Sequence, residues 1–192
     1  MRMKGLWPVL GLGVLVAGCI TQPSLQPLFT EDDCVAVPEI GGTWLTQGDD
    51  DPTTLTLRPK AGGEFEMTLA EKGETQRGAF AVRLGRIGGE LYWDLTARPL
   101  DRDEGLWGEH RLAVHSFARV RVDGDQLELA FFDPRWVKHA VEAGRLDASH
   151  AQVDGDVLLT APTPELQRLI AEHAWEEDFF VEPAVFRRQA VP

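Results

Sequence analysis

The chain has 192 residues, with 31 acidic against 19 basic side chains and a formal net charge of −12. A surface this acidic repels phosphate backbones and anionic headgroups, which excludes nucleic acid as an expected partner. The length suits one domain with a core of its own and is short for two.

The N-terminus has the three parts of a secretory signal. Residues 1–4 carry two positive charges, residues 5–16 are apolar, and two small residues then precede Cys19. The apolar run has about a dozen residues, whereas a membrane-spanning helix needs about 20. From this layout alone, an ordinary signal peptide with an unrelated cysteine and a weak membrane anchor stay open as alternatives.

The motif Val-Ala-Gly-Cys at residues 16–19 resembles the lipobox of bacterial lipoproteins. The resemblance implies that residues 1–18 are a signal peptide cleaved before Cys19. It also implies diacylglycerol on the Cys19 sulfur and acyl chains such as palmitate. Ile20, in place of aspartate, implies sorting to the outer membrane in lipoproteins of the Gram-negative type. We therefore expect an envelope protein that meets the membrane through its N-terminal lipid.

The segment after the signal differs from the rest of the chain. Residues 19–38 contain three prolines and an acidic cluster without periodicity, which predicts a flexible tether and leaves residues 39–192 as the domain. The chain after residue 18 has 17 basic and 31 acidic residues, a net charge near −14. With Cys19 lipidated, Cys34 has no intramolecular partner, so it is either a free thiol or part of an intermolecular bridge.

From Ile40 onward, apolar and polar residues alternate with a period of two. Gly, Asp and Pro clusters bound each run, which indicates half-buried antiparallel strands. Asp-Gly-Asp at 123–125 and again at 154–156 predicts two tight hairpin turns. The alternating runs are residues 55–57, 65–69, 80–84, 91–95, 111–122, 127–131, 148–153 and 157–160.

Two stretches have helical signals instead. Asp133-Pro134 is an N-cap followed by proline at the first helical position, which predicts a helix over about 134–143. Thr163-Pro164-Glu165 predicts a second helix over about 163–174 by the same chemistry. The extended pattern of residues 179–188 then adds a last short strand.

This order of elements predicts a mostly β protein, a single antiparallel up-and-down β-barrel with two short helices. Gly42-Thr43-Trp44 resembles the G-x-W signature of lipocalins, and the late helix followed by a strand resembles their element order. The resemblance implies that Trp44 closes the barrel floor beneath Arg187 or Arg188.

The sequence also departs from the lipocalin pattern. The second lipocalin motif is missing, no arginine precedes the late helix, and the helix at 134–143 is additional. Another antiparallel barrel or a β-sandwich is the alternative.

The inward face of the predicted barrel contains the candidate ligand cavity. Ser116 and Ala118 are small residues in the middle of a strand, which leaves room for an apolar or amphipathic ligand. The alternative is that they admit a large neighbour such as Trp93 or Phe131. The candidate cavity residues are Leu91, Trp93, Leu112, Val114, Ser116 and Ala118.

No motif predicts catalysis, a cofactor or a metal. His110 and His115 are an odd number of residues apart, so on a strand they face opposite ways. None of the serines lies in a G-x-S-x-G elbow. We therefore expect a non-enzymatic protein, either a carrier of a small apolar ligand or an envelope scaffold with a packed barrel. A hydrolase would need a polar constellation that the sequence lacks.

Overall fold

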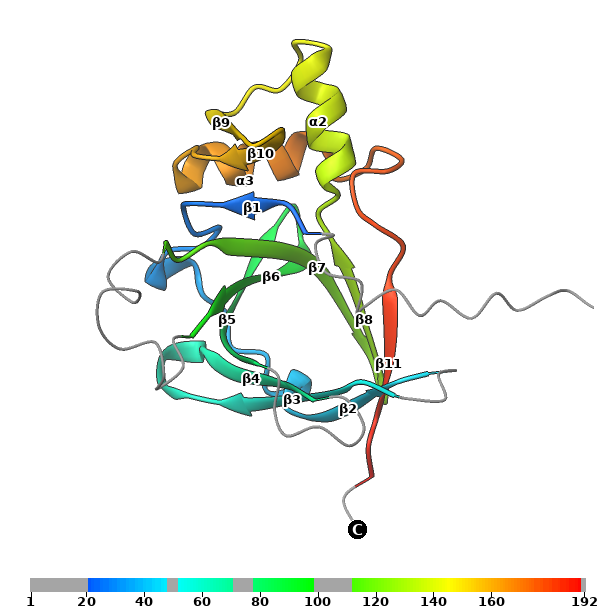
Figure 1. Cartoon of the computed structure of the whole chain (residues 1–192). Helices are drawn as coiled ribbons and strands as arrows, with labels where there is room; N and C mark the ends of the chain where they lie inside the picture. Colours follow the sequence, from blue (N-terminus) through cyan, green and yellow to red (C-terminus); the bar gives the residue numbers. More distant parts are fainter. Residues whose placement is uncertain (1–20, 48–51, 71–77, 99–111, 191–192) are drawn as a thin grey trace, which may run out of the picture.

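The main body of the protein is a closed antiparallel β-barrel of eight strands (Figure 1). The computed structural model describes residues 21–47, 52–70, 78–98 and 112–190. From β2 to β8, each barrel strand pairs with the next one along the chain, including β6 with β7. β11 lies between β8 and β2 and closes the ring. The barrel strands are β2 (Gly42–Thr46), β3 (Thr54–Pro59), β4 (Phe65–Ala70), β5 (Gly78–Ile87), β6 (Glu90–Ala97), β7 (His115–Asp123), β8 (Gln126–Phe131) and β11 (Ala184–Arg188). The predicted up-and-down barrel is confirmed.

A cap lies between β8 and β11 in the chain and consists of α2 (Pro134–Glu142), β9 (His150–Val153), β10 (Asp156–Leu159) and α3 (Thr163–His173). α2 begins where predicted, because Asp133 Oδ1 accepts a hydrogen bond from Arg135 N at 2.8 Å and proline follows Asp133. Asp154 and Gly155 both have positive φ, the requirement of the tight hairpin that joins β9 to β10. Among the described residues, no helix has the length and apolar character to cross a membrane.

The expected flexible tether is wrong for residues 21–38, because this segment is built into the fold. β1 (Pro23–Ser24) pairs antiparallel with the start of β7 and in parallel with β10. Leu28 and Phe29 are buried against the outer wall of the barrel. The short 3-10 turns Glu31–Asp33 and Pro38–Ile40 then lead to the first barrel strand. We call residues 21–37 the strap; Cys19, Ile20 and the signal at 1–18 lie outside the described residues.

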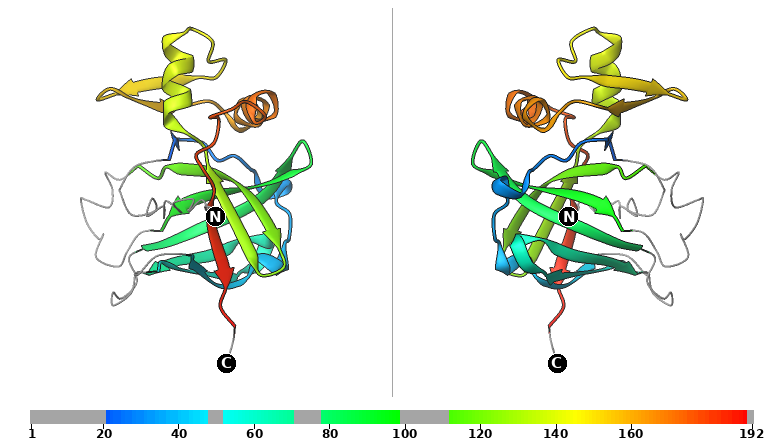
Figure 2. Two further views of the ribbon diagram at one scale, coloured as in Figure 1. Left: turned by 90° about the vertical axis from the view of Figure 1, so that its right-hand side faces the viewer. Right: turned by 90° about the vertical axis from the view of Figure 1, so that its left-hand side faces the viewer.

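The described residues form two hydrophobic cores, which the barrel wall separates. One fills the barrel and includes Trp44, Trp93 and Phe186. The other lies outside, where the cap and the strap cover Tyr92 on β6 and Phe117 on β7. Figure 2 shows the cap on the side of the barrel, not over an end. Strands β6 and β7 are therefore apolar on both faces over part of their length, as expected for a wall that is covered on both sides.

Candidate functional site in and around the barrel

Trp44 closes one end of the barrel, as the lipocalin resemblance implies. Its side chain is fully buried, and its Nε1 donates a hydrogen bond to the Ile40 carbonyl at 2.9 Å. The Arg188 guanidinium carbon lies 4.0 Å from the centre of the Trp44 ring. Arg188 also donates to the carbonyl oxygens of Gly41 at 2.7 Å and Glu39 at 2.5 Å. The Arg188 guanidinium thus stacks on the Trp44 ring and links the last strand, β11, to the residues that directly precede the first barrel strand, β2.

Arg187, the other candidate for the barrel floor, lies on the opposite face of β11. It pairs with Leu45 in the sheet register, whereas Arg188 pairs with Trp44. Arg187 is exposed to solvent. Since successive side chains of a strand alternate between faces, only Arg188 can cover the tryptophan.

The interior of the barrel beside Ala118 is occupied by two aromatic rings. In the sheet register, Ala118 on β7 pairs with Trp93 on β6 and with Phe131 on β8. The Trp93 and Phe131 rings contact each other, with centroids 6.0 Å apart and planes tilted by 57°. Ala118 and Trp93 are fully buried. A small residue at 118 therefore admits the two large neighbours, which is the alternative that the sequence left open.

The other candidate cavity residues do not form one site. Leu91 is buried in the barrel core, and the Ser116 hydroxyl donates to Thr21 Oγ1 in the strap at 3.1 Å. Leu112 and Val114 precede β7, with 68% and 40% of their surfaces exposed. The strand predicted from residue 111 begins only at His115, so Leu112 and Val114 do not line the barrel interior in the way the alternation predicted.

We call the end of the barrel opposite Trp44 the open end; β7 starts there, and β6 and β8 finish there. Its inward side chains are only partly buried: Leu69, Phe80, Leu95, Phe131 and Ala184. Deeper inside, the buried Trp93 Nε1 has no hydrogen-bond partner in the described part of the chain. A buried donor left without an acceptor costs about 1–3 kcal/mol.

A polar cluster joins the strap to the outer wall of the barrel. Asp94 is almost fully buried; its Oδ2 accepts from the Leu28 amide at 2.9 Å, and its Oδ1 lies 2.6 Å from His115 Nδ1. This short contact is a hydrogen bond, in which Nδ1 of the imidazole donates when the carboxylate accepts. Thr96 Oγ1 lies 2.8 Å from the same nitrogen. Sequence reasoning missed this cluster because the register of β6 against β7 could not be derived across the long connection between them.

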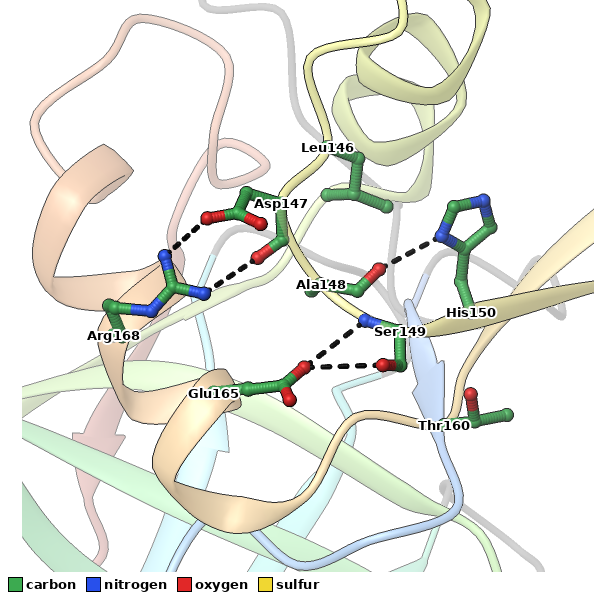
Figure 3. Close-up of a pocket in the computed structure, with 8 residues that line it drawn as sticks. All are labelled: Leu146, Asp147, Ala148, Ser149, His150, Thr160, Glu165 and Arg168. Carbon is green, nitrogen blue, oxygen red and sulfur yellow. Dashed lines mark hydrogen bonds and ion pairs between the residues drawn. The ribbon is translucent and has the colours of Figure 1, made fainter.

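The cap carries an open hollow of about 550 Å³, lined mainly by polar groups (Figure 3). Arg168 donates to the Asp147 carboxylate at 2.6 Å and to its carbonyl at 3.1 Å, and this pairing raises the pKa of the arginine. Glu165 accepts from the Ser149 amide and hydroxyl, both at 3.3 Å. Arg168 is thus paired with the opposite charge of Asp147, whereas Glu165 is held by the uncharged amide and hydroxyl of Ser149.

Cys34 is a free thiol in the strap and is partly buried. Its Sγ donates to the Thr30 carbonyl at 3.3 Å, and burial raises the pKa of the thiol. A raised pKa disfavours the thiolate, which is the nucleophilic form. Across the described ranges, no group of three or more His, Cys, Asp or Glu residues is placed to hold a metal ion.

Comparison with known proteins gives no match: no family model, no curated protein and no solved structure resembles the chain significantly. The resemblance to the lipobox is therefore carried by the residues at 16–19, and the resemblance to the lipocalins by the residues at 42–44 together with the order of the elements.

Proposed function

We propose that the protein is a lipid-anchored component of the bacterial cell envelope, a non-enzymatic scaffold that acts through its surface. The observation that favours a scaffold over a carrier is the contact of Trp93 with Phe131 across Ala118. The space beside Ala118, where a ligand was expected, is occupied by the protein's own Trp93 and Phe131 rings. The polar cluster at Asp94 has a structural task, since it binds the strap to the barrel.

The anchor rests on the lipobox at residues 16–19, and Cys19→Ala tests it. The variant should lose the thiol that receives the lipid and stay unanchored or unprocessed. The acyl chains supply the membrane affinity, at about 0.8 kcal/mol per buried methylene, and the variant would lack this affinity. Metabolic labelling with a fatty acid, followed by membrane fractionation, measures this. Failure of the wild type to incorporate label would end the lipoprotein proposal.

Ala118→Phe tests whether the barrel acts as a packed scaffold. A third ring between Trp93 and Phe131 has no space, so we expect the variant to lose roughly 1–3 kcal/mol of stability, typical of an overpacked core. Urea denaturation measures the change in the free energy of unfolding.

Ala97→Phe is the matched control for this substitution. Ala97 lies on the neighbouring strand β6 but is exposed at the open end, so the same added ring should change stability little. Native mass spectrometry of the wild type should detect no bound apolar ligand. If Ala118→Phe is as stable as the wild type and the wild type carries a ligand that the variant loses, the carrier function replaces the scaffold.

The carrier stays a second candidate because of two observations at the open end. Its inward apolar side chains are partly exposed, and Trp93 Nε1 lacks a partner among the described residues. An apolar ligand that reaches down from the open end with an acceptor atom would satisfy this donor. Such a ligand would lie above the Trp93–Phe131 layer and not in the cavity expected around Ala118.

A further inference from the structure

Among the described strands, β9 forms a free edge of the sheet on the cap. It is the last strand in the sheet order and, within the described ranges, pairs only with β10. Figure 2 shows the hairpin of β9 and β10 reaching outward from the body of the protein. His150, Gln152 and Val153 are exposed, Val153 with 50% of its surface. A binding partner could therefore reach this strand from the solvent.

The hydrogen bonds of the hairpin determine which backbone groups face the free edge. Thr160 N donates to the Ser149 carbonyl at 2.9 Å, so the backbone of Ser149 is directed at β10. This direction alternates along an antiparallel strand, so Ala151 is also directed at β10. His150 and Gln152 direct their N–H and C=O groups at the free edge, where no described residue bonds them.

The free edge lacks the features that usually prevent pairing with another chain. Exposed edges are commonly protected by lysine, proline or a bulge. β9 has the sequence His-Ala-Gln-Val at 150–153, without these residues, and it pairs residue for residue with β10. Its four residues leave room for a short added strand. Free backbone donors and acceptors at an edge are complementary to another extended backbone, so the edge fits an extended peptide.

The charges around β9 are negative. Asp154 and Asp156, at the turn end of β9, are exposed and take no part in the ion pairs of the described cap residues. Residues 146–160 contain three aspartates and neither lysine nor arginine, and residues 133–178 contain ten acidic and four basic residues. A second copy of the chain would bring like charges together at this edge, whereas a basic peptide would meet opposite charges.

We propose that the cap binds an extended basic peptide segment of a partner protein, which adds as a strand to the free edge of β9. The backbones of His150 and Gln152 would form the ladder, and Val153 would contact an apolar side chain of the peptide. A lysine or arginine of the peptide would meet Asp154 or Asp156. The inference rests on the proposed scaffold role and names the surface through which the scaffold acts.

Selection of a phage library of random dodecapeptides on the immobilised full chain tests this surface. We expect the enriched peptides to carry a net positive charge, and fluorescence anisotropy gives their dissociation constants. Gln152→Pro removes an N–H at the free edge without removing a bond to β10, so it should weaken binding about tenfold. Gln152→Ala keeps the N–H and is the matched control, which should bind as the wild type does.

Asp154→Asn combined with Asp156→Asn tests the selection of basic peptides. Asp154 has a φ of 53°, which asparagine also tolerates, so the turn should persist. Loss of the two negative charges should weaken the binding of basic peptides about threefold, and the loss should shrink as salt is added.

Amide hydrogen exchange locates the bound peptide without a substitution. The amides of His150 and Gln152 should gain protection when the peptide binds, whereas the amide of Ala151, which is directed at β10, should not change. Denaturation midpoints verify that each variant is folded; if Gln152→Pro is not, the exchange result decides.

The absence of any enriched peptide, or binding without protection of the two edge amides, would refute the free edge as a peptide site. Peptides that bind the asparagine variant as tightly as the wild type would refute the selection by charge. A wild type that is dimeric by light scattering, with Gln152→Pro monomeric, would make a second copy the occupant. None of these results bears on the anchor or the packed barrel, which fatty-acid labelling and Ala118→Phe test independently.

Discussion

Phe29→Ala should lower the free energy of unfolding by about 3–5 kcal/mol, the cost of removing a buried aromatic side chain. The Phe29 ring is buried against β5, where a Cβ added at Gly85 would come within 2.4 Å of a ring atom and so collide with it. The neighbouring Leu28 is also buried, and its amide bonds the Asp94 carboxylate. Loss of the ring would open a cavity between the strap and the wall of the barrel. Urea denaturation followed by circular dichroism measures the loss.

Gln26→Ala is the control within the same segment. The Gln26 side chain is exposed, so its removal should change stability by no more than about 0.5 kcal/mol. A flexible tether, as the sequence predicts, would make both substitutions harmless. Equal and small effects of the two variants would therefore contradict the packed strap.

A double-mutant cycle with Gly85→Ala tests the contact itself. In the wild-type background the added methyl group collides with the Phe29 ring and should destabilise the protein. In the Phe29→Ala background the ring is absent, so the same methyl group should cost less. Residues in contact give interaction energies of about 0.5–3 kcal/mol in such cycles, and additive effects would show that the ring does not lie on Gly85.

The barrel and its two helices were predictable because their residues follow simple periods. Alternation along strands such as β4 places Phe65 and Met67 on one face, and the structure buries both in the barrel. Asp133 with Pro134 marks the start of α2 through one local hydrogen bond. These signals depend on neighbours in the chain, so a single sequence contains them.

The strap and the hydrophobic core beneath the cap depend on contacts between distant segments of the chain. Their positions could therefore not be predicted from local patterns. Leu28 and Phe29 are adjacent and fit neither period, and their partners lie on β5 and β6. One signal was available: Tyr92 and Phe117 are large apolar residues at outward positions, which indicates that something covers that wall. The sequence did not indicate that the strap, which was expected to be part of a flexible tether, is the segment that covers this wall.

The candidate cavity illustrates a different limit. Alternation correctly placed Trp93 and Ala118 on the inward face. Whether a small inward residue opens a cavity or accommodates a ring depends on the register of three strands, here Trp93 and Phe131 on either side of Ala118. The hairpin at 123–125 fixes one of these registers, but the long connection between β6 and β7 leaves the other undetermined by local sequence.

Trp44→Ala should also cost roughly 3–5 kcal/mol, because it removes the fully buried ring that closes the barrel. The variant also leaves the Ile40 carbonyl without its indole donor and leaves Arg188 without the ring on which it stacks. Ile40 directly precedes β2, and Arg188 is the last residue of β11. Both losses should therefore weaken the pairing between β2 and β11. Chemical denaturation gives the change in the free energy of unfolding, and hydrogen exchange of the β11 amides reports on this pairing.

Trp175→Ala is the matched control, since it removes the same side chain from a site that is 80% exposed beyond the end of α3. The Trp175 indole donates only to the Glu172 carbonyl at 2.6 Å, within its own turn of chain. Its removal should change stability by about 0.5 kcal/mol or less and should leave exchange in β11 unaltered. Equal or reversed losses for the two tryptophans would show that Trp44 does not close the barrel floor in solution, and with it the principal likeness to the lipocalin pattern would be lost.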